Sequence, residues 1–325
     1  MLISRRMALT GMAAMAGLAG AHPARAGAYP DRPVKIVTGF APGGPADVMA
    51  RILAGHLGER LGGTFIVENH PGAGGNIGCN FVARAAPDGT TLLVHTSALV
   101  INPSLYKKPP YDVVADFTPL VELATSPNIF FTNPATGLRS IADLVARAKQ
   151  GSEQISFASA GIGTPPHLSG ELLKLRAGIQ MTHVPYPGGG PCVQAVLQNT
   201  TTIGSNALPP TLPLIASGQL VPLAVTWPTR WHTLPNVPTM LELGYDGFVN
   251  DTFQAFMAPA HLPAEIQDLL VRETLATLAE PAVRAQLEGE GYQVLAGGPQ
   301  AMAARIAREV PMWRDLIDRS GIEHV

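Results

Sequence analysis

The feature that most constrains this chain is a repeated unit made of a short apolar strand, a glycine-rich loop and an amphipathic helix. The unit first appears where residues 34–38 are followed by a Pro-Gly-Gly loop and then by apolar residues at helical spacing. Further strands of this kind are predicted at 64–67, 91–94, 155–158, 181–184, 223–226 and 253–258. This alternation is typical of an α/β fold, with parallel sheets covered by helices on both faces.

The repeat restarts after Pro127, so the chain is predicted to form two lobes, and Ser140 with Asp143 is predicted to cap the first helix of the second run. A proline-rich stretch of weak periodicity follows that run, and the C-terminal region is helical. We expect each lobe to have its own sheet, with the second crossing of the chain between 228 and 252. The predicted lobes are residues 27–127 with 251–325, and residues 128–250.

Residues 1–26 have the composition of an export signal. Arg5 and Arg6 precede a small apolar run, and Ala24-Arg25-Ala26 fits the rule for a cleavage site. The run is shorter than the roughly 20 residues that a membrane-spanning helix needs. We therefore expect a soluble, exported protein that begins near Gly27. The twin-arginine and the ordinary secretory routes both remain open.

The charge and the motifs of the chain exclude several classes of function. The chain has 22 Lys and Arg against 24 Asp and Glu, which gives a net charge of −2. Removal of residues 1–26 would remove three arginines and no acid, so the mature chain would have a net charge of −5. No basic stripe suits nucleic acid. Nucleophile-elbow, P-loop and metalloprotease motifs are absent from the sequence, and its histidines lack metal-ligand spacing. We expect no catalysis, no metal and no cofactor.

Two glycine-rich loops that follow strands are candidate anion sites. The first, at 40–47, contains Gly43 and Gly44, and the second, at 159–167, contains Gly161 and Gly163. Parallel sheets bind ligands beyond the carboxyl ends of their strands, and the helix after each loop offers unpaired N–H groups. Neither loop contains Lys or Arg. We predict that the two loops hold a carboxylate, and that a side chain at Gly43 or Gly163 would occupy the ligand's space.

The same residues also have purely structural interpretations, which remain open. Either loop could be no more than a tight strand-to-helix turn. Asp47 could be a dipole partner in the first turn of its helix. His167 could be a cap or a packing residue, whereas Thr164 adds a hydroxyl donor to the second loop. A third loop at 72–78 has the spacing G-x-G-x-x-x-G, which does not fit the dinucleotide fingerprint.

The chain resembles the substrate-binding proteins of tripartite tricarboxylate transporters, the Bug receptor family. The resemblance runs from about Tyr29 to the C-terminus, and its short motifs are specific when taken together. They are Tyr29-Pro30-Asp31-Arg32-Pro33-Val34, Ala41-Pro42-Gly43-Gly44, Val67-Glu68-Asn69, Gly72-Ala73-Gly74-Gly75-Asn76-Ile77-Gly78, Ala86-Pro87-Asp88-Gly89, Asn102-Pro103, Tyr111-Asp112, Gly161-Ile162-Gly163-Thr164, His183-Val184-Pro185-Tyr186 and Val237-Pro238-Thr239.

The resemblance implies a periplasmic-binding-protein-like fold of type II, a Venus flytrap with a ligand cleft between two lobes. It implies a periplasmic monomer that binds a small organic acid, partly through ordered water, and delivers it to a two-subunit membrane permease. The ligand-binding positions that it implies are Ala41, Gly43, Gly44 and Asp47 in the first loop, Gly161, Gly163, Thr164 and His167 in the second, and Asn206.

Some residues depart from the family's pattern. Pro45 stands where Ser or Thr is usual, so a hydroxyl and an N–H are both lost. Pro187 stands where a basic residue is frequent, Asn206 lies where an Asp is common, and Phe253 replaces a common Trp. These departures predict a ligand that is less charged or more apolar than usual. Two alternatives stay open: a receptor that signals to a membrane partner, and an enzyme that uses the same cleft.

Overall fold

The strands form two ladders that meet in one long strand, β4 (Phe117–Thr132). The computed structural model describes residues 29–151, 155–320 and 322–325, so the expected export signal at 1–26 lies outside the described residues. The first ladder contains β1 (Val34–Thr38), β2 (Phe65–Asn69), β3 (Thr91–Thr96), β9 (Asp251–Pro259) and β10 (Gln293–Gly297). The second contains β5 (Ser156–Ser159), β6 (Thr182–Pro185), β7 (Ile203–Ala207) and β8 (Val221–Val225).

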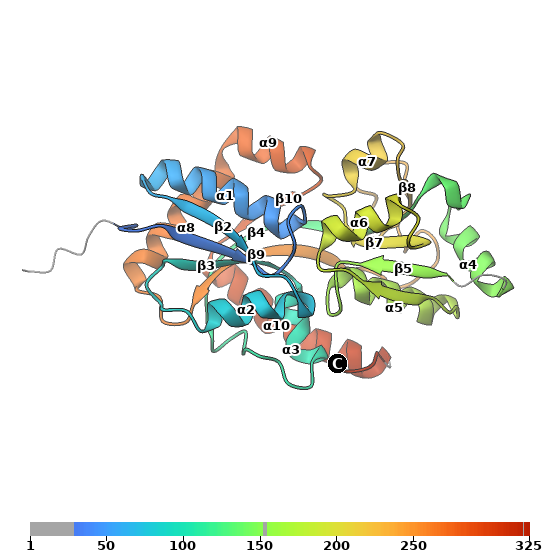
Figure 1. Cartoon of the computed structure of the whole chain (residues 1–325), viewed down its shortest axis with the longest axis horizontal. Helices are drawn as coiled ribbons and strands as arrows, with labels where there is room; N and C mark the ends of the chain where they lie inside the picture. Colours follow the sequence, from blue (N-terminus) through green and yellow to red (C-terminus); the bar gives the residue numbers. More distant parts are fainter. Residues whose placement is uncertain (1–28, 152–154, 321) are drawn as a thin grey trace, which may run out of the picture.

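The expectation of two separate sheets is wrong, because β4 belongs to both ladders. The order of the strands is β2-β1-β3-β9-β4-β7-β5-β6, and β10 and β8 also pair with β4. β4 pairs with β9 as far as Pro127 and with β7 from Asn128 onward. Its 16 residues span about 50 Å at the usual rise, which is long enough to serve both lobes. Figure 1 shows it crossing between the two halves of the molecule.

The sheets are also mixed rather than wholly parallel. β1 is parallel to β2 and β3, and β5 is parallel to β6 and β7. β4 runs antiparallel to β7, β8, β9 and β10. The parallel strands therefore lie at the outer side of each ladder, and β9 and β4 lie between the two parallel groups.

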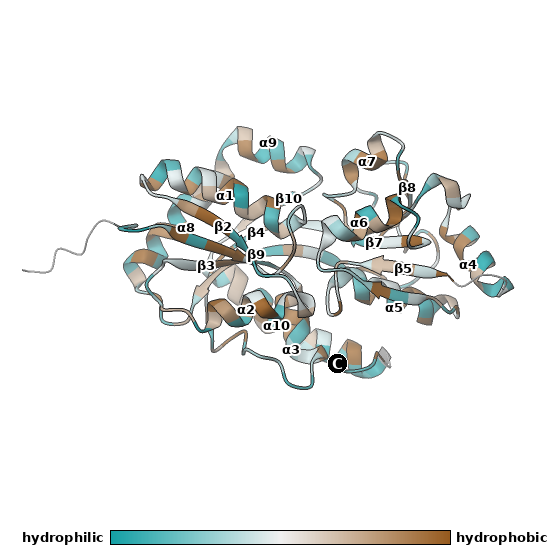
Figure 2. Ribbon diagram, in the orientation of Figure 1, coloured by the Kyte–Doolittle hydropathy of each residue, from teal (hydrophilic) through white to brown (hydrophobic). Residues whose placement is uncertain are grey.

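Helices cover both faces of each ladder, as the alternating sequence predicts. Those of the first lobe are α1 (Pro45–Leu61), α2 (Asn76–Ala83), α3 (Ala98–Leu105), α8 (Ala264–Ala279), α9 (Pro281–Gly289) and α10 (Pro299–Ser320). Those of the second lobe are α4 (Ile141–Gln150), α5 (Pro165–Ala177), α6 (Gly189–Leu197) and α7 (Leu212–Ala216). Two short 3₁₀ turns, η1 (Ala73–Gly75) and η2 (Pro134–Thr136), complete the helical segments described. Each lobe has two apolar cores, one per face. In Figure 2, β1 is brown, whereas α1 mixes teal and brown.

Local signals in the sequence fix several helix ends. The Ser140 hydroxyl accepts the N–H of Asp143 at 3.0 Å, which confirms the predicted cap of α4. Gly62 and Gly178 end α1 and α5 in the left-handed conformation, with φ of 65° and 62°. Cys79 and Cys192 are buried free thiols. Among the described residues, no helix has the length and apolar character needed to cross a membrane.

Candidate functional site

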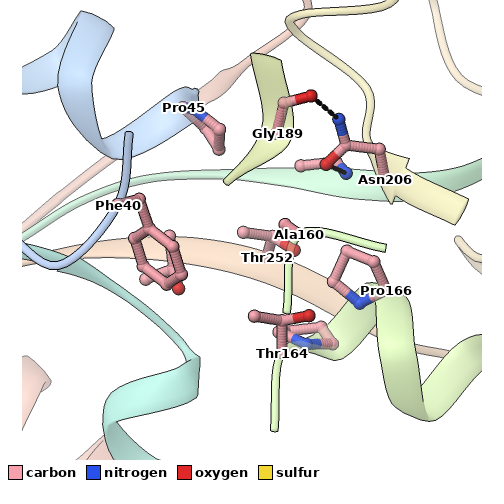
Figure 3. A pocket seen from close by; sticks show the side chains of 11 residues that line it. Phe40, Pro45, Ala160, Thr164, Pro166, Gly189, Asn206 and Thr252 are labelled. Carbon is pink, nitrogen blue, oxygen red and sulfur yellow. Dashed lines mark hydrogen bonds between the residues drawn. The ribbon is translucent and has the colours of Figure 1, made fainter. Parts of the chain in front are cut away.

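A small cavity lies between the two lobes, beyond the carboxyl ends of strands from both ladders (Figure 3). Its volume is about 20 Å³, which is room for about one water molecule. This is the position at which open parallel sheets bind ligands. The walls are formed by Phe40, Pro45, Thr96, Ala160, Thr164, Pro165, Pro166, Gly189, Asn206, Ala207 and Thr252.

Three helices begin at this cavity: α1 at Pro45, α5 at Pro165 and α6 at Gly189. The start of a helix carries a partial positive charge of about half a unit, so the cavity favours an anion. None of the lining residues is Lys, Arg or His. No group of side chains within the described residues has the composition of a metal site. The attraction for an anion therefore comes from the helix ends.

The free backbone donors belong to two of the three helices. The first N–H groups of a helix have no partner inside it. Within the described part of the chain, no hydrogen bond takes up the N–H groups of Ala46 and Asp47 in α1, or those of Gly189 and Gly190 in α6. Such N–H groups can donate hydrogen bonds to an anionic ligand. Of these residues, Gly189 lines the cavity, and Ala46, Asp47 and Gly190 lie next to lining residues in the chain.

The start of α5 offers no such donors. Pro165 and Pro166 have no N–H, and the N–H of His167 donates to the Thr164 hydroxyl at 3.4 Å. That hydroxyl donates to the carbonyl of Gly161 at 2.6 Å. Thr164 thus lines the cavity but acts there as the cap of α5.

Two more polar side chains of the lining are also engaged in the structure. The amide of Asn206 donates to the carbonyl of Gly189 at 3.0 Å and accepts the N–H of Ala207 at 3.0 Å. The hydroxyl of Thr252 donates to the Asn128 amide oxygen at 2.6 Å. Thr96 and the second amide proton of Asn206 remain as side-chain donors. Most of the polar side chains that line the cavity therefore form hydrogen bonds within the protein and hold the loops in place.

Of the predicted ligand-binding residues, Thr164 and Asn206 line the cavity. The others lie in the loops around it and use their own groups locally. The N–H of Gly43 donates to Asp47 at 3.0 Å, and the N–H of Gly163 donates to the His167 ring at 3.3 Å. Gly161 donates to the hydroxyl of Ser159 at 3.2 Å. The structure brings both loops to one cleft, and their contacts with a ligand stay a prediction.

Asp47 holds the first loop in shape. Its carboxylate accepts two bonds from Arg51 at 3.0 Å each, one from Gly43 and one from the Asn69 amide at 2.9 Å. Burial alone would raise the pKa of Asp47, but these hydrogen bonds and the Arg51 charge outweigh it and lower the pKa. Asp47 is therefore an anion whose charge is neutralised by the protein itself.

The loop that begins α6 was not predicted from the sequence. Pro187, Gly188, Gly189 and Gly190 follow β6 and open a helix, which is the same strand–glycine–helix pattern as in the two predicted loops. The pattern could have identified a third anion-binding loop. Thr96 and Thr252 belong to the cavity for a different reason, since the pairing of distant strands places them there.

The two lobes touch each other on both sides of the cavity. On one side, the N–H of Ala41 donates to the carbonyl of Pro187 at 3.0 Å. On the other, a Cβ added to Gly74 would lie 1.9 Å from the Ile162 oxygen, and one added to Gly163 would lie 2.0 Å from the Asn102 amide oxygen. Gly163 therefore faces the opposite lobe. Backbone approaches of this kind leave no room for side chains.

Two buried histidines, His95 and His167, and the half-buried His183 lie next to the cleft. His95 precedes the lining residue Thr96, and the rings of His167 and His183 lie 4.3 Å apart behind the second loop. Nε2 of His183 is 2.7 Å from the Ser159 hydroxyl. Burial lowers the pKa of His95 and His167 to about 4. Burial, together with the positive charges nearby, lowers that of His183 to about 3.

These histidines predict that the protein loses stability in mild acid. Between about pH 6.5 and 4 the unfolded chain takes up protons that the folded protein cannot, so the free energy of unfolding falls as the pH falls. Melting temperatures at pH 7 and pH 5 test this. His183→Gln keeps an amide near Ser159 but cannot titrate, so it should show a smaller drop than the wild type. Equal drops would contradict the role given to His183.

The sequence profile described as tripartite tricarboxylate transporter family receptor, TctC, matches residues 49–322. The chain belongs to this family. Protein BugT of Bordetella pertussis is 36% identical to the receptor over 324 residues, which is 99% of each chain. The family assignment confirms what the sequence motifs predict.

Solved structures of relatives have the same fold. That of the periplasmic binding protein BugD is 36% identical with a TM-score of 0.88, covering 91% of the receptor and 99% of BugD. That of R. palustris Rpa4515 with adipate is 31% identical with a TM-score of 0.87, covering 91% and 99%. MatC from Rhodopseudomonas palustris with bound malate is 28% identical with a TM-score of 0.84, covering 89% and 100%.

These comparisons confirm the predicted fold class, a two-lobed periplasmic binding protein. They also make the chain a solute-binding receptor of the TctC family, whose members are periplasmic binding proteins. Adipate and malate are the molecules that accompany two of the related structures.

Proposed function

We propose that the receptor captures a small organic carboxylate between its lobes and delivers it to a two-subunit membrane permease. The observation that carries the proposal is that three helices, α1, α5 and α6, begin at one cavity whose lining has no cationic side chain. Helix starts bind oxyanions in many proteins. The adipate and malate of the related structures are carboxylates, which supports the same ligand class.

The proposal includes the cellular setting. Residues 1–26 direct export, the mature chain begins near Gly27, and the receptor works in the periplasm as a monomer without a cofactor. Membership of the receptor family favours transport over catalysis in the cleft. A sensing role remains the second candidate, and it would use the same cavity with a signalling partner in place of the permease.

The cavity of about 20 Å³ adjoins a second space of about 260 Å³ that shares Phe40 and Ala160 with it, so a bound acid either extends into that space or is admitted by a movement of the lobes. We propose that residues 27–127 with 251–325 form one body and residues 128–250 the other. The support is the change of partner in β4 after Pro127 and the neighbouring start of β9. Asn128 lies at this junction, where its amide donates to the Asn250 carbonyl at 3.3 Å.

A binding assay with acids and their amides tests the ligand class. A ligand that binds only the folded state at 100 times its Kd adds about 2.7 kcal/mol of stability, so a thermal-shift screen detects it. Small organic acids should raise the melting temperature and the matching primary amides should not. Uptake of the acid that binds most tightly should be lost when the gene is deleted. Amides that bind as well as their acids would contradict the proposal.

A matched pair of variants at Ala160 tests whether the cavity is the site. Ala160 lines the cavity and is 9% exposed. Asp and Asn have nearly the same size, so Ala160→Asp and Ala160→Asn fill the same space and differ in charge. Repulsion should make the acid bind at least 10-fold more weakly to Ala160→Asp than to Ala160→Asn. Equal affinities would place the carboxylate elsewhere.

A further inference from the structure

The space that adjoins the cavity is much larger than the cavity itself. Its volume is about 260 Å³, against about 20 Å³ for the cavity. Phe40 of the first loop and Ala160 of the second line both of them, and Figure 3 shows these two side chains at the cavity. A cavity of about 150 Å³ is large enough to bind benzene. The second space therefore has room for a ring or for a chain of about six carbons.

Both lobes contribute to the second space. The first lobe supplies the loop at 72–75 and Tyr106, and the second supplies residues 160–162 and 185–187. Among the described residues that line the space, none is Lys, Arg, His, Asp or Glu. The polar side-chain groups of this lining are the hydroxyls of Tyr106 and Tyr186. Any polar group that a ligand places here must therefore meet a phenol or the backbone.

The rings of these two tyrosines are held by different lobes. Tyr106 follows the last residue of α3 and packs against the apolar core that α3 shares with α10 in the first lobe. Tyr186 follows β6 and packs against the core beside α6 in the second lobe. Both residues are half-buried. Burial raises the pKa of Tyr106, so its hydroxyl keeps its proton at neutral pH and can donate it in a hydrogen bond.

The hydroxyls of both tyrosines are without a partner in the protein. Of the six tyrosines in the chain, Tyr29, Tyr111 and Tyr292 donate to backbone carbonyls at 2.8, 3.2 and 3.1 Å. Within the part of the chain that the structure describes, no hydrogen bond takes up the hydroxyl of Tyr106 or Tyr186. A tyrosine hydroxyl that leaves water usually finds a hydrogen-bond partner. Here a ligand in the second space would supply it.

We infer that the ligand is an elongated acid that occupies both spaces. Its carboxylate is held at the cavity, and its apolar body passes between Phe40 and Ala160. At its far end an oxygen atom, from a hydroxyl, a carbonyl or a second carboxylate, accepts hydrogen bonds from Tyr106 and Tyr186. This inference rests on the proposed function, since it takes the carboxylate at the cavity as given. The two tyrosines belong to different lobes, so a ligand that reaches both also ties the lobes together.

Titration calorimetry with butanoate, hexanoate, 6-hydroxyhexanoate and adipate tests the inference. Hexanoate should bind about 10-fold tighter than butanoate, because it buries two more methylene groups. At least one of the two acids with a distal oxygen should bind about 10-fold tighter than hexanoate. The hydroxy acid and the diacid distinguish a neutral from a charged distal group. If hexanoate binds as tightly as both, the inference is overturned and the proposed function stands. Failure of all four acids to bind would overturn both.

Two variants that remove only a hydroxyl test the roles of the tyrosines. In Tyr106→Phe and in Tyr186→Phe, the advantage of the better oxygen-bearing acid over hexanoate should fall about 3- to 10-fold, which is what one hydrogen bond contributes. A purely structural role would weaken both acids equally and leave their ratio unchanged. Tyr245→Phe is the control, since Tyr245 lines neither space and packs on Phe248. Its ratio should stay within about twofold of the wild type. A ratio that neither Tyr106→Phe nor Tyr186→Phe changes would overturn the inference.

Discussion

Gly163→Val is expected to weaken ligand binding about 100-fold, or about 2.7 kcal/mol, by holding the two lobes apart. The Cβ of any residue at this position would lie 2.0 Å from the Asn102 amide oxygen and 3.1 Å from its carbonyl carbon, both in the opposite lobe. Valine is branched at that atom, so the lobes could not approach as they do here. Calorimetry measures the affinity. Small-angle scattering should show that the variant, unlike the wild type, does not contract when the acid is added.

The variant needs a control, because Gly163 has a φ of 81° that strains any other residue. Gly218 has a φ of 74°, and a Cβ added there meets nothing within 4 Å. Gly218→Val should therefore show a similar loss of stability and an unchanged affinity. If both variants bind the acid equally well, the contact between Gly163 and Asn102 is not part of the ligand-bound form. The second loop would then be no more than a turn.

The sequence could predict where the site lies but not how its residues are used. A glycine-rich loop between a strand and a helix is a local pattern, and the sheet places such loops at one edge. The partner of each group is a tertiary property. Nothing near Ala41 in the sequence indicates that its N–H meets Pro187, or that Gly163 faces Asn102. That a side chain at Gly163 would fill the ligand's space stays a prediction, and its clash with Asn102 is a tertiary feature that the sequence does not indicate.

The strands that the sequence analysis missed have sequences that hide them. β4 contains Pro119 and Pro127, which argue against a central strand. β7 has the sequence Ile-Gly-Ser-Asn-Ala, and it is fully buried although most of its residues are small or polar. The Asn206 amide in that strand donates to the Gly189 carbonyl, so a polar residue of the strand holds the start of α6. The outer parallel strands are apolar runs, and these were predicted to within three residues at each end.

An ionic cluster around the buried Arg305 links β4 and β9, the two strands that join the lobes. The Arg305 guanidinium in α10 donates to Glu122 of β4 at 2.6 Å, to Asp251 of β9 at 2.6 Å and to Glu309 at 2.7 Å. It also lies 4.0 Å above the ring of Phe253. Arg305 is 9% exposed, so its charge depends on these three carboxylates for stabilisation. The cluster holds Asp251 in place at the junction between the lobes.

Arg305→Met is expected to destabilise the folded protein by about 3–5 kcal/mol, because it leaves the buried Glu309 and the half-buried Glu122 and Asp251 without the cation that they share. Urea unfolding measures the loss. Burial raises the pKa of Glu309, and the variant removes the Arg305 charge that opposes this rise, so the loss relative to the wild type should shrink as the pH falls from 7 to 5. Arg308→Met is the control, since Arg308 lies in the same helix with a side chain that is 65% exposed and touches Glu309 at 3.3 Å. It should cost no more than about 1 kcal/mol. If the two variants are equally stable, the cluster does not hold the strands together, and the lobes are joined by the backbone of β4 and β9 alone.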